Sequence, residues 1–414
     1  MSYVELIKLF YVEPDRYEDI YAQRFNSPYA QHIDFTVGQF PAFFVVTPEI
    51  QDRMLSIQKM DKKILFLCKE LPEVALEQFS KRCLIDEIVL TNNIEGVHST
   101  RREIDGILMN LGRQDQHTRF RGLVQKYLML QTNEDIPLRT CADIRQVYDD
   151  LTLREVVEDC PENMPDGEIF RKGSVSVQSA TQKEIHRGLY PEEKIIRAME
   201  DALDYLNDDS KELLYRISVF HYLLGYIHPF YDGNGRLNRF ISSYMLAKEL
   251  QPILSFRLSY TIKENIREYY EAFKTCNHPR NRGDLTPFLH MFLRVVYKST
   301  EHLLAALEER ARRLNHYEER IIKLPQVNDQ TFYRLYYFLV QAELFSERGI
   351  STQELLSYLD LSRATLRKKL GEIDREGLLR TEQYKREKYY GIRLDRLDGY
   401  RPETSVKARA PEAP

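Results

Sequence analysis

Apolar residues recur at helical spacing along most of this 414-residue chain, with few breaks. A period near 3.6 places the apolar side chains on one face of a helix, so the pattern predicts a mainly α-helical fold. One such stripe leads up to Gly96, a residue that can adopt the left-handed conformation in which helices often end. The stripe consists of Phe79, Cys83, Ile85, Ile88 and Val89. We therefore expect an amphipathic helix that ends near Glu95.

Two segments depart from this pattern. Between Gly173 and Pro191, apolar and polar residues alternate around a polar turn, and this period of two is typical of strands. We expect a small β-hairpin there, in an otherwise helical core. The end of the chain is rich in Pro, Ala and charged residues, and this composition predicts a disordered tail over residues 396–414.

Residues 326–395 carry the signals of a separate domain. Ser351-Thr-Gln-Glu354 is a capping box that opens one helix, Ser362 caps a second helix after a tight link, and an extended stretch follows Gly377. This order resembles a winged helix-turn-helix. Basic residues on the second helix favour DNA contact, whereas nearby acidic residues favour protein docking, so both interpretations stay open. The basic residues are Arg363, Arg367, Lys368 and Lys369, and the acidic ones are Glu372, Asp374 and Glu376.

Breaks in the periodicity divide the chain into five regions. Residues 1–110 are expected to form a helical N-terminal region, and residues 111–300 a helical core that contains the hairpin. A charged connector helix over 301–325 should follow, because Pro325 breaks the helical pattern. The winged helix over 326–395 and the tail complete the chain.

Composition narrows the class of protein. A hydrophobic share of 43% can fill more than one core, and a net charge of -4 argues against nucleic-acid binding by the whole surface. The N-terminus lacks a secretion signal pattern, and no apolar run approaches the roughly 20 residues of a membrane span, so we expect a cytoplasmic protein without membrane contact. The five cysteines lack paired metal-type spacing and predict no zinc site.

Residues 228–239 hold the densest group of reactive side chains: His-Pro-Phe-Tyr-Asp-Gly-Asn-Gly-Arg-Leu-Asn-Arg. Pro229 should end the preceding apolar helix, which leaves His228 at a helix-to-loop break as an exposed, orientable base. Phe230 is expected to point into the core and anchor the loop.

The same stretch is suited to hold a polyphosphate. Its turn tolerates positive φ, so successive N–H groups can point inward, and a helix that begins there aims its positive end at the same place. The turn consists of Gly233, Asn234 and Gly235. Arg236 and Arg239 lie three residues apart and can bind phosphate oxygens. Asp232, just before the turn, is the candidate ligand for Mg²⁺.

The stretch matches H-x-F-x-[DE]-G-N-G-R-x-x-R at every defined position and resembles the signature of the Fic family. The resemblance implies an adenylyltransferase that moves AMP from ATP, with Mg²⁺, to a Ser, Thr or Tyr hydroxyl of a target protein. It also implies that His228 deprotonates the incoming hydroxyl and that Asn234 helps to hold the α-phosphate. Pyrophosphate would then leave toward Arg236 and Arg239.

A second, upstream segment, Thr91-Asn-Asn-Ile-Glu95-Gly96, resembles the inhibitory motif [ST]-x-x-x-E-[GN] of the same family. In family members with this motif, the glutamate pairs with the last arginine of the signature, here Arg239, and prevents the γ-phosphate from binding productively. The resemblance implies that the helix ending at Glu95 is autoinhibitory. A solvated glutamate at a helix end is the simpler alternative.

Two more segments are consistent with the resemblance. Fic proteins place a β-hairpin flap where residues 173–191 lie, and the flap is thought to hold the target segment by strand addition. The segment from Glu268 to Asn277 resembles the part of the family that lines the nucleobase pocket. Tyr270 and Asn277 are therefore candidates for contact with adenine.

Two other functions stay open. The same site could remove AMP from a modified protein, with Glu95 positioning water, or the chain could be a DNA-binding regulator whose Fic core senses nucleotide. The sequence does not identify the target protein or the donor nucleotide, and it leaves open whether the chain forms a homo-oligomer.

Overall fold

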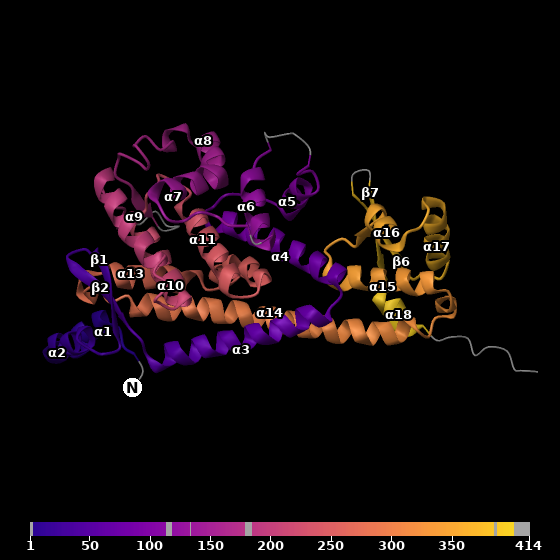
Figure 1. The fold of residues 1–414 in the computed structure, drawn as a ribbon, viewed down its shortest axis with the longest axis horizontal. Helices are drawn as coiled ribbons and strands as arrows, with labels where there is room; N and C mark the ends of the chain where they lie inside the picture. Colours follow the sequence, from indigo (N-terminus) through magenta and orange to yellow (C-terminus); the bar gives the residue numbers. More distant parts are fainter. Residues whose placement is uncertain (1–2, 113–117, 133, 179–183, 385–386, 401–414) are drawn as a thin grey trace, which may run out of the picture. The chain divides into compact units, whose positions relative to one another are not determined.

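The computed structural model describes residues 3–112, 118–132, 134–178, 184–384 and 387–400. Most of these residues lie in helices and the few strands are short, which confirms the mainly α-helical fold (Figure 1). The chain divides into a first unit, residues 1–65 with 83–304, and a second unit, residues 66–82 with 305–414. The division falls within three helices, which contribute residues to both units. They are α3 (Pro48–Glu70), α4 (Glu73–Ile94) and α14 (Thr286–Ile321).

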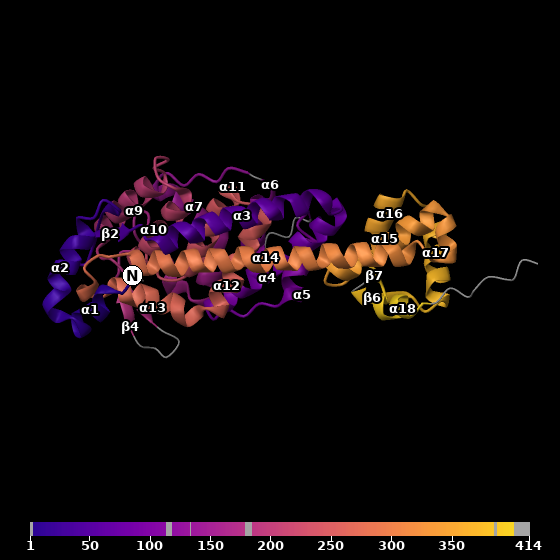
Figure 2. The ribbon, with the colours of Figure 1, turned by 90° about the horizontal axis from the view of Figure 1, so that it is seen from below.

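The N-terminal region was expected to be helical, but it also contains an antiparallel hairpin. Helices α1 (Leu6–Val12) and α2 (Pro14–Phe25) precede strands β1 (Ala30–Val37) and β2 (Phe40–Val45), and α2 lies beside β2 (Figures 1 and 2). The expectation was wrong because β1 has a clear period of two. Ile33, Phe35 and Val37 are buried, and the residues between them are exposed.

The core of the first unit is built around α10 (Leu213–Ile227), which is apolar on almost every face and buried along most of its length. A helix of this kind must be surrounded by others, and α9 (Glu192–Leu206), α11 (Asn234–Glu249) and α13 (Ile266–Asn277) pack against it. None of the helices in the described ranges, α10 included, is long and apolar enough to cross a membrane.

The other helices of the first unit surround this core. They are α5 (Arg101–Leu108), α6 (Arg121–Thr132), α7 (Cys141–Tyr148), the π-helix η1 (Asp149–Leu153), α8 (Arg154–Asp159) and α12 (Leu258–Glu264). Short 3₁₀ turns lie at η2 (Pro161–Asn163), η3 (Pro252–Arg257) and η4 (Pro279–Asn281). Strands β3 (Ser176–Gln178) and β4 (Glu184–Arg187) pair antiparallel and confirm the small hairpin predicted between Gly173 and Pro191. Residues 179–183, which join the two strands, lie outside the described residues, so the predicted polar turn is not tested.

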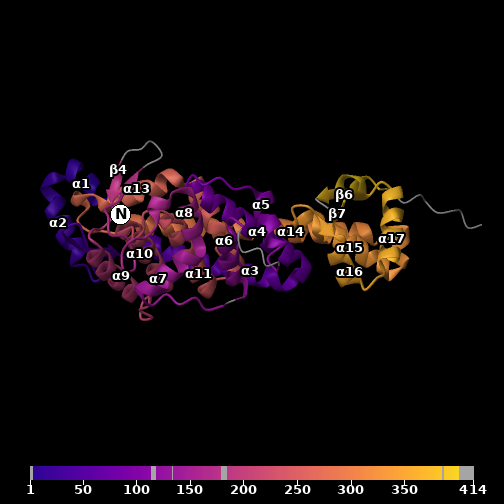
Figure 3. The same cartoon turned by 90° about the horizontal axis from the view of Figure 1, so that it is seen from above.

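The second unit contains a helix-turn-helix and a three-stranded sheet in the order β5-β7-β6. Its elements follow the order helix, strand, helix, helix, strand, strand, which is consistent with the predicted winged helix, and β7 lies beside α15 (Figure 3). As predicted, Ser351 forms a capping box with Glu354, and Ser362 caps the next helix. The elements are η5 (Pro325–Asn328), α15 (Gln330–Phe345), β5 (Ile350–Ser351), α16 (Thr352–Leu359), α17 (Arg363–Arg375), β6 (Leu379–Tyr384), β7 (Glu387–Ile392) and α18 (Leu394–Gly399).

Two expectations about the C-terminal half need correction. The charged helix expected over 301–325 is the second half of α14, which ends at Ile321. The tail expected to be disordered from residue 396 begins within α18, where Leu397 is buried and Asp398 accepts a hydrogen bond from the Tyr317 hydroxyl at 3.0 Å. Residues 401–414, the rest of this predicted tail, lie outside the described residues.

Candidate functional site

The loop between α10 and α11 is held by its own side chains. α10 ends at Ile227, and the next residue, His228, has a left-handed φ of 52° and precedes Pro229. Phe230 is fully buried, as predicted, and its ring stacks on Tyr148 at 3.6 Å between centroids. The amide of Asn234 spans the loop: its Oδ1 accepts from Phe230 N at 2.9 Å, and its Nδ2 donates to Phe230 O at 2.8 Å. The side chain of Asn234 therefore fixes the loop, and its backbone N–H is a candidate for the expected contact with phosphate.

The turn that starts α11 needs a glycine at one position. Gly233 has a φ of 78°, and a Cβ there would lie 3.0 Å from Thr152 Oγ1. α11 begins at Asn234, so the N–H groups of its first turn have no partner within the helix. These N–H groups and the helix dipole make the start of α11 suited to an anion.

A cavity of about 140 Å³ lies over the start of α11. It brings together most of the residues singled out in the sequence: Glu95, His228, Asn234, Gly235, Arg239, Tyr270 and Asn277. It also contains residues that the sequence did not suggest: His186, Gly225, Asn238, Tyr269 and Phe273. Asp232, Gly233 and Arg236 were predicted but are not among the residues that line it.

Glu95 and Arg239 form an ion pair inside this cavity, with 2.8 Å between Glu95 Oε1 and Arg239 Nη2. Arg239 is 1% exposed and also donates to Thr91, from Nε to Oγ1 at 2.8 Å and from Nη2 to the backbone oxygen at 3.0 Å. Burial favours a lower pKa for Arg239, but Glu95, Tyr269 and Tyr127 together outweigh burial and the pKa is raised. A Cβ at Gly235 would overlap the Glu95 carboxylate. The carboxylate therefore occupies the space where an anion would meet the start of α11.

The face of α4 that carries Thr91 has another carboxylate one turn earlier. Glu87 is fully buried, and both of its oxygens accept from the N–H of Ser259 in α12, at 2.9 and 3.0 Å. Burial raises the pKa of Glu87 to about 7. Glu87, Thr91 and Glu95 are spaced four residues apart, so they follow one side of the helix end. No pattern in the sequence distinguishes Glu87 from other glutamates on helices.

His228 is less exposed than the sequence suggested. Its side chain is half-buried, and burial lowers its pKa to about 4; Arg171 acts in the same direction and Glu95 opposes them. This pKa lies well below the ordinary value of about 6.5 for a histidine side chain. The imidazole is neutral at pH 7 and can accept a proton.

Arg171 was not predicted, although it connects the base to the hairpin. It is fully buried and donates to the backbone oxygen of His228 from Nε at 3.0 Å and from Nη2 at 2.8 Å. It also donates to the backbone oxygens of Leu189, at 2.9 Å, and of Gly173. One guanidinium thus holds the end of α10 and both ends of the hairpin segment. The chain has 59 Lys and Arg residues, and no local pattern distinguishes this one.

The far side of the cavity is formed by α13. Tyr270 is 37% exposed, and Asn277 Oδ1 accepts a hydrogen bond from the buried Tyr222 hydroxyl at 2.7 Å. Because that bond uses the Asn277 oxygen, the NH₂ group is the part of the side chain that can donate to a ligand. Tyr269 is buried and its hydroxyl lies 2.7 Å from His221 Nε2. Aromatic faces beside an amide donor suit a planar base that carries acceptor atoms.

Two predicted ligands lie away from the cavity. Arg236 is 1% exposed, and its Nε and Nη1 have no hydrogen-bond acceptor among the described residues. Asp232 Oδ1 accepts from Gly233 N at 2.5 Å, and no contact of Oδ2 is seen in the described part of the chain. One carboxylate with a free oxygen, next to an anion-binding turn, fits the way proteins hold Mg²⁺ together with phosphate. No group of three potential metal ligands occurs among the described residues.

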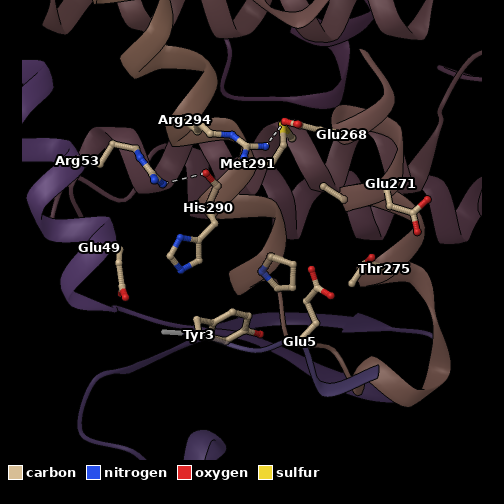
Figure 4. A pocket seen from close by; sticks show the side chains of 12 residues that line it. Tyr3, Glu5, Glu49, Arg53, Glu268, Glu271, Thr275, His290, Met291 and Arg294 are labelled. Atoms are coloured by element: carbon tan, nitrogen blue, oxygen red, sulfur yellow. Dashed lines mark hydrogen bonds and ion pairs between the residues drawn. The ribbon is translucent and has the colours of Figure 1, made fainter. Parts of the chain in front are cut away.

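A second, more open pocket of about 510 Å³ lies on the other face of α13 (Figure 4). It is lined by four glutamates, Glu5, Glu49, Glu268 and Glu271, against two arginines. Arg294 pairs with Glu268, and Arg53 donates to His290 O at 3.1 Å. An excess of carboxylates repels a polyphosphate, so the smaller cavity at His228 is the candidate anion site.

Comparison with known proteins agrees with this location. Residues 140–246, which contain the hairpin and the stretch 228–239, match the Fic/DOC family. Protein adenylyltransferase fic-1 of Caenorhabditis elegans is 29% identical over 119 residues, which are 28% of this chain and 22% of that protein. Protein adenylyltransferase Fic of Nematostella vectensis is 31% identical over 117 residues, or 28% and 25%. The matched region thus spans a quarter or less of these relatives.

Among solved structures, a Fic family protein from Desulfovibrio desulfuricans G20 superposes with a TM-score of 0.52 at 19% identity. The superposition covers 84% of this chain and 97% of that one, so the two share their fold.

Proposed function

We propose that this protein transfers AMP from ATP to a hydroxyl side chain of a target protein. The observation that carries the proposal is a single cavity with a neutral His228 at one wall and the anion-binding start of α11 at another. The similar proteins named adenylyltransferases support the same reaction class.

In the proposed reaction the target hydroxyl oxygen attacks the α-phosphorus of ATP. A new P–O bond forms to the target, the bond between the α-phosphorus and the bridging oxygen breaks, and pyrophosphate leaves. His228 accepts the hydroxyl proton. The N–H groups of Asn234 and Gly235 stabilise the charge on the α-phosphate oxygens, and the adenine lies against Tyr270 and Asn277.

The arginines of the signature would bind the rest of the triphosphate. Arg239 lies in the cavity wall, and its present partners are Glu95 and Thr91. Arg236 does not line the cavity, but its buried Nε and Nη1 have no acceptor among the residues that the structure describes, which is a costly arrangement that an anionic partner would relieve. Mg²⁺ held by Asp232 would neutralise charge on the phosphates.

We further propose that Glu95 keeps the enzyme inactive. Its carboxylate pairs with Arg239 and lies against Gly235, so it competes with phosphate for the same donors and repels phosphate oxygens. In this assignment residues 1–110 form the inhibitory N-terminal region, 111–300 the catalytic core, 301–325 a connector and 326–395 the winged helix.

Removal of AMP by the same site is the second candidate. Glu95 and His228 line the same cavity, so a water held by Glu95 could attack a phosphate bound at the start of α11. Supplying a labelled, AMP-modified target would separate the two directions, because only the removal reaction releases labelled AMP.

The test is to incubate the Glu95→Gly chain and host lysate with ATP labelled at the α- or the γ-phosphate. Transfer of AMP predicts that the chain adds protein label above that of lysate alone with the α-label only. Added label from the γ-position, above that from the kinases of the lysate, would indicate phosphate transfer. No added α-label, or equal α-label with the His228→Ala chain, would refute the proposal. The same assay with α-labelled UTP would show whether another nucleotide serves as donor.

A further inference from the structure

The second unit presents an exposed helix in the position that winged helices use to read DNA. α16 ends at Leu359, Asp360 turns the chain with a φ of 51°, and α17 starts at Arg363. One face of α17 is buried through Leu366, Leu370 and Ile373, and the opposite face is exposed. In helix-turn-helix proteins the second helix enters the major groove, with its N-terminal residues toward the bases.

The exposed face of α17 is basic in its N-terminal half. Arg363, Arg367 and Lys368 are exposed, and the structure gives them no ion pair or hydrogen bond from their side chains to any described residue. The acidic residues Glu372 and Asp374 lie in the C-terminal half. Three exposed cations on two helical turns complement the negative charge of a phosphate backbone.

Lys369, the fourth basic residue noted in the sequence, faces the other way. Its ammonium group lies 2.5 Å from Asp329 Oδ2 and 3.9 Å from the centroid of the Phe332 ring. It therefore holds α17 on α15 and does not belong to the exposed basic face.

Gly371 is a second, independent sign of a partner on this face. A glycine inside a helix costs about 1 kcal/mol relative to alanine. A Cβ at Gly371 would meet no atom within 4 Å, so packing inside the protein does not require a glycine there. Gly371 lies four residues from both Arg367 and Arg375, on the exposed side. A missing side chain between cations allows the backbone of a partner to approach closely.

We propose that this basic face, Arg363, Arg367, Lys368 and Gly371, binds duplex DNA. α17 lies in the major groove, the three cations contact phosphates, and Gly371 lets the helix come close to the sugar-phosphate backbone. Because the whole chain has a net charge of -4, the attraction to DNA comes from this basic face and not from the overall charge. DNA binding by this face does not require the reaction proposed for the cavity at His228.

The test is binding of the full chain to a fluorescent mixed-sequence duplex of about 30 base pairs, three helical turns, at several salt concentrations. Replacement of Arg363, Arg367 and Lys368 by alanine should weaken binding at least about tenfold at low salt. It should also reduce the salt slope by about 0.9 for each phosphate that the protein no longer neutralises. The matched control replaces three exposed lysines of α3 by alanine, with the same change in charge and no expected weakening. They are Lys59, Lys62 and Lys63.

The Gly371→Gln variant tests the same face without an expected loss of stability. Glutamine favours helix over glycine and has room, so the melting temperature should stay or rise, while the added bulk should remove most of the DNA binding. No binding by the parent at low salt, equal weakening in the control triple, or full binding by the triple variant would overturn the proposal and leave this face to a protein partner. Full binding by Gly371→Gln would overturn the close approach at that residue.

Discussion

Replacing Glu95 by glycine should increase the rate of AMP transfer, because it removes the proposed inhibitory carboxylate. The perturbation removes one partner of a pair in which Arg239 is 1% and Glu95 23% exposed, with 2.8 Å between charged atoms. A hydrogen bond between charged groups at such a site contributes about 1.5–3 kcal/mol. Because each 1.4 kcal/mol is about a factor of ten, the share of molecules with Arg239 open to phosphate, and the transfer rate, should rise roughly ten- to hundredfold. Arg239 should keep its orientation, since its bonds to Thr91 remain.

The assay is the initial rate of protein labelling from α-labelled ATP by the purified chain. Glu95→Gln keeps the size of the side chain and removes its charge, so its rate should lie between those of the parent and Glu95→Gly. Asn93→Gly is the matched control, because Asn93 is exposed on the same helix end and a glycine there loosens the helix without touching Arg239. Equal labelling by the parent and Glu95→Gly, or an equal gain in Asn93→Gly, would refute inhibition by this carboxylate.

Four further outcomes are expected. His228→Ala should lower the transfer rate by about 10²–10⁴ while ATP binding persists. Because burial holds the pKa of His228 at about 4, the transfer rate of the parent should stay level from pH 8 to 6 and fall only toward pH 4. A fall in rate centred near pH 6.5 would contradict this assignment. Asp232→Ala should raise the Mg²⁺ concentration needed for half-maximal transfer, and an unchanged titration would remove Asp232 as the ligand. Asn234→Ala should slow transfer and lower the melting temperature by loosening the loop; slower transfer at an unchanged melting temperature would instead favour a direct phosphate contact. Burial raises the pKa of Glu87 from its ordinary 4.5 to about 7. The stability that the protonated Glu87 side chain contributes is therefore complete below pH 4.5 and is lost as the pH rises through 7. The Glu87→Gln variant should have a higher melting temperature than the parent at about pH 8 but not at pH 5.

The sequence predicted what depends on local pattern. Helical periodicity, the hairpin and the capping box at Ser351 are set by residues a few positions apart, and the structure has all three. The stretch 228–239 is equally local, so its position between two helices could be predicted. The pairing of Glu95 with Arg239 came from family resemblance, because nothing in the spacing of residues 144 apart indicates contact.

What escaped prediction depends on side-chain direction and on distant packing. Arg236 and Arg239 share a helix face by spacing, yet only Arg239 lines the cavity, because a displacement of three residues turns the side chain by about 60°. Asn234 was expected to point at phosphate, but it binds the loop. Arg171 acts through backbone oxygens that no sequence pattern marks. The pKa of His228 follows from burial, which the sequence around it did not reveal.

The contact between Gly235 and the Glu95 carboxylate has a consequence for how such chains can diverge. Any side chain at position 235 would overlap the Glu95 carboxylate in its present position. A mutation at position 95 therefore changes which residues position 235 can accept, and a mutation at position 235 changes which residues position 95 can accept. In an alignment of chains that keep this helix, a residue larger than glycine at position 235 should occur only together with a shorter residue at 95. Position 235 should be invariant wherever the glutamate is kept, even though the two positions lie far apart in the chain.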